Sequence, residues 1–254
     1  MKYQVRRCFD RAHATYRQAA VVQREIAAQC LQLVPADRDY PTVLEIGAGG
    51  GVLTRPALDG LEVQQYIACD ISKAMLQNLP CRSEVRTVQG DGEALPMATP
   101  CVDLLLSAST MQWYTAPERA LPENLSLLRP GGRFALAVFV RGTLPELRAA
   151  SEATGFGATQ PLVSASTYRH IMARTAAMHW HSRVQTHIQW HDSVADFLRS
   201  HKKTGATFSP GAKHYLGKNR FRQFCAEYAA RFGCQGKIPA RYRVLYIWGC
   251  RHCR

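Results

Sequence analysis

Short runs of mostly apolar residues alternate along the first 140 positions with segments in which apolar residues recur at helical spacing. The runs predict five strands, at residues 43–46, 63–69, 84–89, 102–107 and 133–140. The intervening segments predict helices, at residues 9–33, 52–59, 73–79 and 117–129. Because the strands do not alternate between apolar and polar residues, both faces of the sheet should be covered. The pattern therefore predicts an α/β fold with a parallel sheet.

Beyond residue 140 the periodicity is looser but still predicts structure. It indicates helices at residues 144–154, 167–175, 193–203 and 221–232, an amphipathic strand at 179–190 and a last strand at 241–248. The helical residues between the last two strands are rich in lysine and arginine, which suits a lid. We expect an N-terminal helical cap (1–40), an α/β domain (41–191), a basic helical lid insertion (192–238) and a final strand with a basic tail (239–254).

Composition narrows the possible location of the protein. Of the 254 residues, 46% are hydrophobic, which is enough for a sizeable core. No apolar run approaches the roughly 18 residues that a membrane span needs, and the first ten residues lack the apolar segment of a secretory signal. Nine scattered cysteines suit a reducing compartment. We expect a cytoplasmic protein with no membrane partner.

Two groups of potential metal ligands have unfavourable spacing. Cys250 and Cys253 have the spacing of half a zinc site, but the sequence contains no second pair of this kind. Four histidines share one face of the strand predicted at 179–190, where they are expected to face solvent or pack under the lid. They are His179, His181, His187 and His191. We predict no metal site.

The formal net charge of +13 is concentrated at both ends and in the last hundred residues. Such an excess attracts polyanions, either nucleic acid or an acidic protein, over long distances. A soluble basic surface without a specific partner is the alternative.

The run Thr42-Val-Leu-Glu-Ile-Gly-Ala-Gly-Gly-Gly51 joins the first predicted strand to a helix through a cluster of glycines. A turn without side chains brings main-chain N–H groups close to a ligand at a helix start, as nucleotide-type cofactors require. Asp70 ends the second strand about 20 residues past the glycines, where a carboxylate can accept both hydroxyls of a ribose. Dinucleotide-binding proteins share these two features, so they do not identify the cofactor.

Three further motifs distinguish the cofactor. Glu45 opens the pattern Glu-x-Gly-x-Gly-x-Gly, Asp91-Gly92 follows the third strand, and Leu128-Arg-Pro-Gly-Gly132 precedes the fifth. With them, residues 40–140 resemble the class I S-adenosylmethionine-dependent methyltransferases. The resemblance implies a Rossmann-like sheet, mostly parallel with an antiparallel last strand, and S-adenosyl-L-methionine as the cofactor.

The same resemblance implies a role for each motif. The glycine loop contacts the methionine part of the cofactor, the acid that ends strand two holds the ribose, and the acid after strand three meets the adenine amine. The cofactor-binding residues implied here are Glu45, Gly47, Gly49, Gly51, Asp70, Ile71, Asp91 and Gly92.

The segments outside these motifs resemble a narrower family, the malonyl-acyl-carrier-protein O-methyltransferases of biotin synthesis, over nearly the whole chain. The more specific segments are Gln112-Trp113 and Gly142-Thr-Leu-Pro-Glu-Leu147, supported by Phe9–Ala20 and His201–Thr207. Such enzymes esterify the free carboxylate of a malonyl thioester, so that fatty-acid synthesis will extend it. The chain departs from its relatives at Pro122 and in its basic, cysteine-rich C-terminus, which affects no cofactor residue.

A carboxylate is already a nucleophile at pH 7, so this reaction needs alignment and exclusion of water rather than a general base. Arg141, just past the fifth strand, is either the guanidinium that binds the carboxylate or a solvated loop residue. Tyr16 either closes over the cofactor or donates to the carboxylate, or it packs a helix. Trp113 forms an apolar wall of the acceptor pocket or belongs to the core.

The predicted basic helix offers a docking surface for an acidic acyl-carrier protein. Its cations are Arg199, Lys202 and Lys203, with Lys213, Lys218, Arg220 and Arg222 beyond. Docking through such a surface should be fast and salt-sensitive. A solvated helix face is the alternative.

Other functions compatible with the cofactor motifs are another carboxylate or quinone methyltransferase, an RNA or protein methyltransferase, and a cofactor-binding regulator without turnover. Residues 107–113 lack the Asn/Asp-Pro-Pro-aromatic loop of amine-methylating nucleic-acid enzymes, and the sequence contains no aromatic–basic RNA-binding module. We therefore predict methyl transfer to a malonyl thioester on acyl-carrier protein or coenzyme A, and no nucleic-acid partner.

Overall fold

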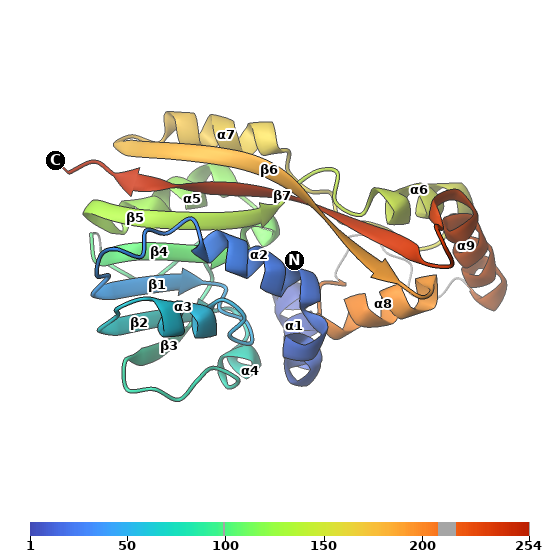
Figure 1. Cartoon of the computed structure of the whole chain (residues 1–254), viewed down its shortest axis with the longest axis horizontal. Coiled ribbons are helices and arrows are strands. Elements are labelled where there is room, and N and C mark those ends of the chain that lie inside the picture. The colour runs from blue at the N-terminus through green and yellow to red at the C-terminus, as the bar shows by residue number, and fades with distance from the viewer. Residues whose placement is uncertain (99, 208–216, 254) are drawn as a thin grey trace.

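The computed structural model describes residues 1–98, 100–207 and 217–253. In this part of the chain a seven-stranded sheet has the order β3-β2-β1-β4-β5-β7-β6 (Figure 1). The strands are β1 (Thr42–Ile46), β2 (Gln65–Asp70), β3 (Val85–Gln89), β4 (Val102–Ala108), β5 (Leu128–Phe139), β6 (Met178–His191) and β7 (Ile238–Arg251). Strands β1 to β5 are parallel, and β7 runs antiparallel to both β5 and β6. The predicted fold class is confirmed.

Helices cover both faces and the carboxyl edge of the sheet (Figure 1). They are α1 (Lys2–Ala19), α2 (Val21–Leu31), α3 (Thr54–Gly60), α4 (Lys73–Leu76), the short 3₁₀ helix η1 (Met111–Trp113), α5 (Pro117–Ser126), α6 (Pro145–Thr154), α7 (Ala165–Arg174), α8 (Val194–Lys203) and α9 (Gly217–Phe232). None of these helices is both long and apolar enough to cross a membrane.

The central strands are buried on both faces, as their unbroken apolar sequence predicts. Leu104 and Leu106 of β4 belong to one hydrophobic cluster, whereas Leu105 belongs to the cluster on the other face. Successive side chains of a strand point to opposite faces, so an apolar run supplies both clusters at once. Because β1 pairs in parallel with both β2 and β4, the carboxyl ends of the three strands meet at one edge.

The predicted helix at residues 9–33 is two helices. The chain breaks at Ala20, where φ is −77° and ψ is 52°, and α2 continues in a new direction. Ala20 is fully buried, so tertiary packing rather than a glycine or proline sets the break. As a result α1 lies over the carboxyl edge of the sheet while α2 packs beside β5 and β4 (Figure 1).

The helix predicted at residues 117–129 is shorter and ends at Ser126. Helix α5 begins at Pro117, which occupies its first position, and Pro122 lies inside the helix instead of near its start. The motif Arg129-Pro-Gly-Gly132 does not separate this helix from the next strand either. It is an irregularity within β5, because Val102 pairs with Leu128 while Leu104 already pairs with Arg133.

Helices α8 and α9 lie between β6 and β7 in the chain and beyond the carboxyl edge of the parallel strands (Figure 1). Ser193 caps α8 by accepting a hydrogen bond from the Asp196 amide, as its sequence predicts. The Thr15 hydroxyl of α1 donates to the Lys203 carbonyl at 2.9 Å, and Phe156, just after α6, packs against Phe221 and Phe224 of α9. Helices α1, α6, α8 and α9 thereby enclose the space above the strand ends.

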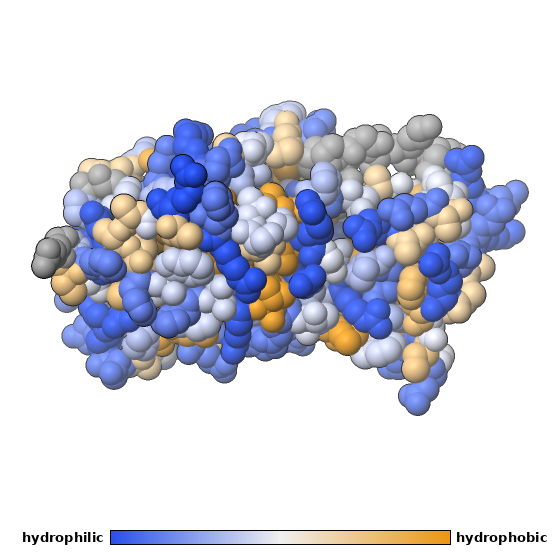
Figure 2. Space-filling view, turned by 90° about the horizontal axis from the view of Figure 1, so that it is seen from above, coloured by the Kyte–Doolittle hydropathy of each residue, from blue (hydrophilic) through white to orange (hydrophobic). Residues whose placement is uncertain are grey.

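The face along β6 is mostly hydrophilic, with a short hydrophobic strip near its middle (Figure 2). Ile188 and Trp190 of β6 are about half exposed. Arg183 of the same strand is exposed and lies over the Tyr246 ring.

Candidate active site

Two cavities open at the carboxyl edge of the sheet. The smaller, of about 60 Å³, lies over the glycine loop and the ends of β2 and β3. The larger, of about 250 Å³, lies under α1, α6, α8 and α9. Four residues line both cavities, and they are Phe9, Tyr16, Ser109 and Trp113. These shared residues mark the place where a group could pass from one cavity to the other.

Two glycines of the loop line the smaller cavity, and a side chain is disfavoured at both, at Gly47 by lack of space and at Gly49 by its backbone conformation. Gly47 has a φ of 79°, and a Cβ there would lie 1.9 Å from the Thr110 hydroxyl oxygen. The amides of Gly47 and Ala48 donate to the Cys69 carbonyl at 2.7 and 3.0 Å. Gly49 has a φ of 52° and lies against the Tyr16 ring. The loop is therefore fixed to the end of β2 and covered by α1.

Asp70, the last residue of β2, presents its carboxylate to the smaller cavity. One oxygen accepts the Gly49 amide and the other accepts the Ser72 amide, both at 2.8 Å. Burial raises the pKa of Asp70 to about 6, although these two bonds act to lower it. Each carboxylate oxygen has a second lone pair, so the two oxygens of Asp70 can still accept hydrogen bonds from two hydroxyl groups.

The turn after β3 brings two carboxylates together with a lysine from α1. The Lys2 ammonium lies 2.8 Å from Asp91 and 2.5 Å from Glu93. Burial acts to raise the pKa of Glu93, but hydrogen bonds from Lys2, Thr115 and Ala116 outweigh it and hold that pKa below its ordinary value. Lys2 thus ties the first turn of α1 to this side of the cavity.

Glu45 and Gly51, two of the predicted cofactor residues, do not line the smaller cavity. Glu45 is buried on the opposite face of β1 from Leu44 and Ile46, where it accepts hydrogen bonds of 2.6 Å from the Thr54 and Tyr66 hydroxyls. Burial raises the pKa of Glu45 to about 7. Thr54 is the first residue of α3, so its hydrogen bond to Glu45 joins β1 to the helix that follows the glycine loop. Glu45 thus holds the loop in place and does not face the cavity.

The remaining predicted cofactor residues do line the smaller cavity. Gly47, Gly49, Asp70, Ile71, Asp91 and Gly92 gather there, together with Tyr16 and Trp113. Tyr16 lies over the glycine loop, and burial with the nearby Asp70 and Glu45 carboxylates raises the pKa of its phenol. The phenol is therefore neutral at pH 7 and able to donate a hydrogen bond.

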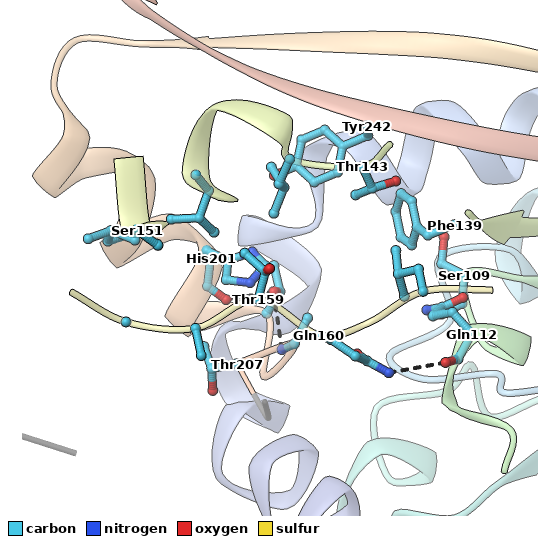
Figure 3. A pocket seen from close by; sticks show the side chains of 18 of the residues that line it. Ser109, Gln112, Phe139, Thr143, Ser151, Thr159, Gln160, His201, Thr207 and Tyr242 are labelled. Carbon is cyan, nitrogen blue, oxygen red and sulfur yellow. Dashed lines mark hydrogen bonds between the residues drawn. The ribbon is translucent and has the colours of Figure 1, made fainter. Parts of the chain in front are cut away.

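The larger cavity is elongated and mostly apolar. Ser109 and Gln112 lie at one end, and Ser151, His201 and Thr207 lie at the other (Figure 3). Among the described residues that line it, His201 alone is a basic or acidic side chain. Burial lowers the pKa of His201, so its ring is neutral at pH 7.

Four residues that line this neutral interior carry buried polar atoms without partners among the described residues. The Ser109 hydroxyl and the side-chain oxygen Oε1 of Gln112 are buried at one end, and Oε1 of Gln23 and the Ser151 hydroxyl are buried elsewhere in its wall; none of these four atoms has a hydrogen-bond partner in the part of the chain that the structure describes. An unsatisfied buried polar group costs about 1–3 kcal/mol. The cavity is therefore suited to a ligand that carries hydrogen-bonding groups on an otherwise apolar path.

The predicted cationic residues lie outside both cavities. Arg141 is exposed just past β5, and its backbone amide donates to the Val163 carbonyl at 3.0 Å. Arg199, Lys202 and Lys203 are exposed on α8, close in sequence to His201 and Thr204, which line the larger cavity. Arg199 forms an ion pair with Asp196. Lys213 lies outside the described residues, whereas Lys218, Arg220 and Arg222 are exposed on α9.

Sequence reasoning missed Lys2, Ser109, Thr110 and Tyr114, all of which line the smaller cavity. Lys2 resembles any surface lysine of a helix. Ser109 and Thr110 directly follow the fourth strand, and that position at the carboxyl edge was a signal that could have identified them. Among the described residues no group of three or more histidine, cysteine, aspartate or glutamate side chains is arranged to hold a metal ion.

Comparison with known proteins gives a consistent set of similarities. The family described as "Methyltransferase domain" matches residues 44–136. A malonyl-[acyl-carrier protein] O-methyltransferase from Geobacter sulfurreducens is 32% identical over 97% of this chain and 98% of its own length. The biotin biosynthesis bifunctional protein BioHC from Cellvibrio japonicus is 31% identical, over 98% of this chain and 50% of its own length.

Solved structures share the fold at lower identity. The YcgJ protein from Bacillus subtilis has a TM-score of 0.62 at 18% identity, covering 87% of this chain and 97% of that one. A phosphoethanolamine N-methyltransferase from Haemonchus contortus, solved in complex with S-adenosyl-L-methionine, has a TM-score of 0.55 at 13% identity, covering 89% of this chain and 52% of that one.

Proposed function

This chain belongs to the family of malonyl-[acyl-carrier protein] O-methyltransferases, and we propose that it methylates the free carboxylate of a malonyl thioester on acyl-carrier protein. The methyl donor is S-adenosyl-L-methionine, and the malonyl methyl ester formed is the primer for the pimeloyl chain of biotin. The observation that carries the proposal is the meeting of two cavities at Phe9, Tyr16, Ser109 and Trp113. The smaller cavity has the residues for the cofactor, and the larger cavity is neutral and large enough for an acyl thioester.

The residues of the smaller cavity fit the proposed cofactor. The main chain at Gly47 and Gly49 would hold its methionine part, Asp70 its ribose hydroxyls and Asp91 its adenine amine. When bound, S-adenosyl-L-methionine supplies a sulfonium methyl group: an oxygen–carbon bond forms to the acceptor carboxylate, the carbon–sulfur bond breaks with its electron pair left on sulfur, and no proton is transferred.

The neutral, mostly apolar wall of the larger cavity favours a reaction between an anionic acceptor and a cationic methyl donor. Methyl transfer between a carboxylate and a sulfonium cancels two opposite charges, and such a reaction is favoured where water is excluded. Phe9 and Trp113 line both cavities and Phe139 lines the larger one, so apolar side chains would surround the reacting groups. Tyr16, neutral and placed at that junction, would donate to the cofactor or to the acceptor. No general base is needed.

A docking surface for the carrier follows from the charge around α8. Lys202 and Lys203 are exposed beside residues that line the larger cavity, so an acidic carrier held there would place its thioester arm near the cavity. Helices α8 and α9, which belong to the predicted lid insertion, would then cover the acceptor. Arg141, exposed and outside both cavities, would contribute at the rim instead of binding the carboxylate inside.

A cytoplasmic site of action is part of this proposal. All nine cysteines are free thiols, which suits a reducing compartment. The proposed reaction also requires that malonyl-carrier protein and S-adenosyl-L-methionine be present in the same compartment.

The direct test incubates the protein with S-adenosyl-L-methionine and malonyl-carrier protein and measures the mass of the carrier. We expect the mass to rise by one methyl group, with no change for acetyl-carrier protein, which has no free carboxylate. Calorimetry with S-adenosylhomocysteine confirms that the protein used is able to bind cofactor. Cofactor binding without methylation of malonyl-carrier would overturn the proposed activity and favour a regulator or a different acceptor.

A further inference from the structure

We propose that the Ser109 hydroxyl binds the acceptor carboxylate by donating a hydrogen bond to the oxygen that does not attack. This inference rests on the proposed function and extends it to a residue that determines which acceptors are methylated. Ser109 lies directly after β4, at the junction of the two cavities.

The first observation is the backbone of Ser109, which has a φ of 60°. A residue with a Cβ is strained in this left-handed region, and glycine is the residue that adopts it freely. Such strain in a non-glycine residue is concentrated at functional sites. The chain therefore carries a side chain at a position where the backbone alone would favour glycine.

The second observation is that the hydroxyl oxygen of this strained residue is buried without a hydrogen-bond partner among the described residues. Its backbone, in contrast, is fully engaged. The Ser109 amide donates to the Ala137 carbonyl at 2.8 Å, and the Gln112 side-chain amide donates to the Ser109 carbonyl at 2.6 Å. The residue is thus held firmly, with its hydroxyl as the group left to bind a ligand.

Gln112 also links this turn to the far wall of the larger cavity. The Gln160 side chain donates to the Gln112 carbonyl at 3.1 Å, as Figure 3 shows beside Ser109. The turn that presents Ser109 is therefore held from two sides, from β5 through Ala137 and from the 156–163 segment through Gln160. A fixed donor orients its acceptor better than a mobile one.

The third observation is the neutrality of the wall around Ser109. No lysine or arginine is among the described residues that line the larger cavity, so the described part of its wall offers a carboxylate neutral donors. A single hydroxyl occupies one carboxylate oxygen and leaves the other free to attack, whereas a bidentate guanidinium would occupy both. In the reaction the free oxygen forms its bond to the methyl carbon while the carbon–sulfur bond breaks, and the hydroxyl keeps its proton.

The test compares Ser109→Ala and Ser109→Gly with Ser109→Asn, which tolerates a positive φ and keeps a neutral hydrogen-bond donor. With malonyl-carrier protein as the substrate we expect kcat/KM to fall by about 10- to 100-fold in the first two variants and to be largely retained in the third. The glycine variant relieves the backbone strain and should melt at a higher temperature than the alanine variant. If both variants lose activity although their melting temperatures differ, the loss is due to the missing hydroxyl and not to lower stability.

Two readouts separate this role from others. The affinity for S-adenosyl-L-methionine, measured by calorimetry, should change by less than about twofold, and inhibition by propionyl-carrier protein, which lacks the carboxylate, should be the same in wild type and Ser109→Ala. Wild-type activity in Ser109→Ala, or a cofactor affinity that falls in step with kcat/KM, would overturn the assignment. Failure of the wild-type chain itself to methylate malonyl-carrier would overturn the proposed function, and this assignment with it.

Discussion

The Lys2 ammonium and the Asp91 carboxylate form an ion pair of 2.8 Å that joins the first turn of α1 to the turn after β3. Oδ1 of Asp91 accepts this bond and the Glu93 amide at 3.0 Å. Oδ2 is therefore the oxygen suited to accept the adenine amine. The same lysine contacts Glu93, which is almost fully buried.

We expect Lys2→Met to weaken cofactor binding by about 3- to 10-fold, since loss of a partly buried ion pair releases α1 from the cavity. Helix α1 supplies Val5, Phe9 and Tyr16 to that cavity. Calorimetric titration with S-adenosylhomocysteine measures the effect. Arg11→Met, an exposed position on the same helix, is the matched control and should leave the affinity unchanged. Equal affinities for the two variants would contradict the role of Lys2.

Asp70 should make cofactor affinity dependent on pH. Because burial raises its pKa to about 6, Asp70 becomes protonated as the pH falls through about 6 and loses the charge that accepts the ribose hydroxyls. We expect the dissociation constant to rise by up to about tenfold per pH unit below that value.

Asp70→Asn is the control for this titration. It should bind the cofactor weakly and show none of the added pH dependence of the wild type, which also corrects for titration of the cofactor itself. Parallel pH profiles for the two proteins would show that Asp70 is not the titrating group.

Glu45 should influence stability instead of cofactor contact. Burial raises its folded pKa to about 7 from an ordinary value of 4.5. A raised pKa means that the contribution of the protonated carboxyl to stability is complete below about pH 4.5 and is lost as the pH rises through about 7. Glu45→Gln keeps an oxygen that can accept the Thr54 and Tyr66 hydroxyls but carries no charge.

We therefore expect Glu45→Gln to be more stable than wild type at pH 8, by up to about 3 kcal/mol, and close to wild type at pH 5. Denaturant unfolding across this pH range measures the difference. A difference that is constant with pH would mean that the carboxyl is not titrating in the folded state.

The exposed lysines at the end of α8 should matter for the carrier and not for a small thioester. We expect Lys202→Glu/Lys203→Glu to raise KM for malonyl-carrier protein by about tenfold and to reduce its salt dependence. The double reversal Arg119→Glu/Arg174→Glu, exposed on α5 and α7, is the charge-matched control. An equal effect on malonyl-pantetheine, which carries no acidic protein surface, would argue against docking.

Part of this site could be predicted from the sequence because it depends on where strands end. Gly47, Asp70 and Asp91 follow apolar runs directly, and the carboxyl ends of parallel strands meet at one edge whatever the rest of the chain does. The place of Glu45 outside the cavity also follows from the sequence, because the two-residue period of a strand puts it on the opposite face from Leu44 and Ile46.

Other features depend on packing that the sequence does not encode locally. The bend at Ala20, in a stretch without glycine or proline, decides that Lys2 and Tyr16 reach the cavity. The left-handed conformation of Ser109 is imposed by hydrogen bonds to Ala137 and Gln112. Arg141 occupies a suitable place in the sequence, but being next to a strand end does not determine where its side chain points.

The two cavities draw on different stretches of the chain, and this has an evolutionary consequence. Every residue that lines the smaller cavity lies between Lys2 and Tyr114, whereas the larger one also recruits residues as far along as Tyr242. The helices α8 and α9 are carried on the paired strands β6 and β7. Mutation and insertion in that later stretch can change which acceptor is bound without altering the residues of the smaller cavity. Descendants of such a chain can therefore acquire new acceptors and keep the same methyl donor.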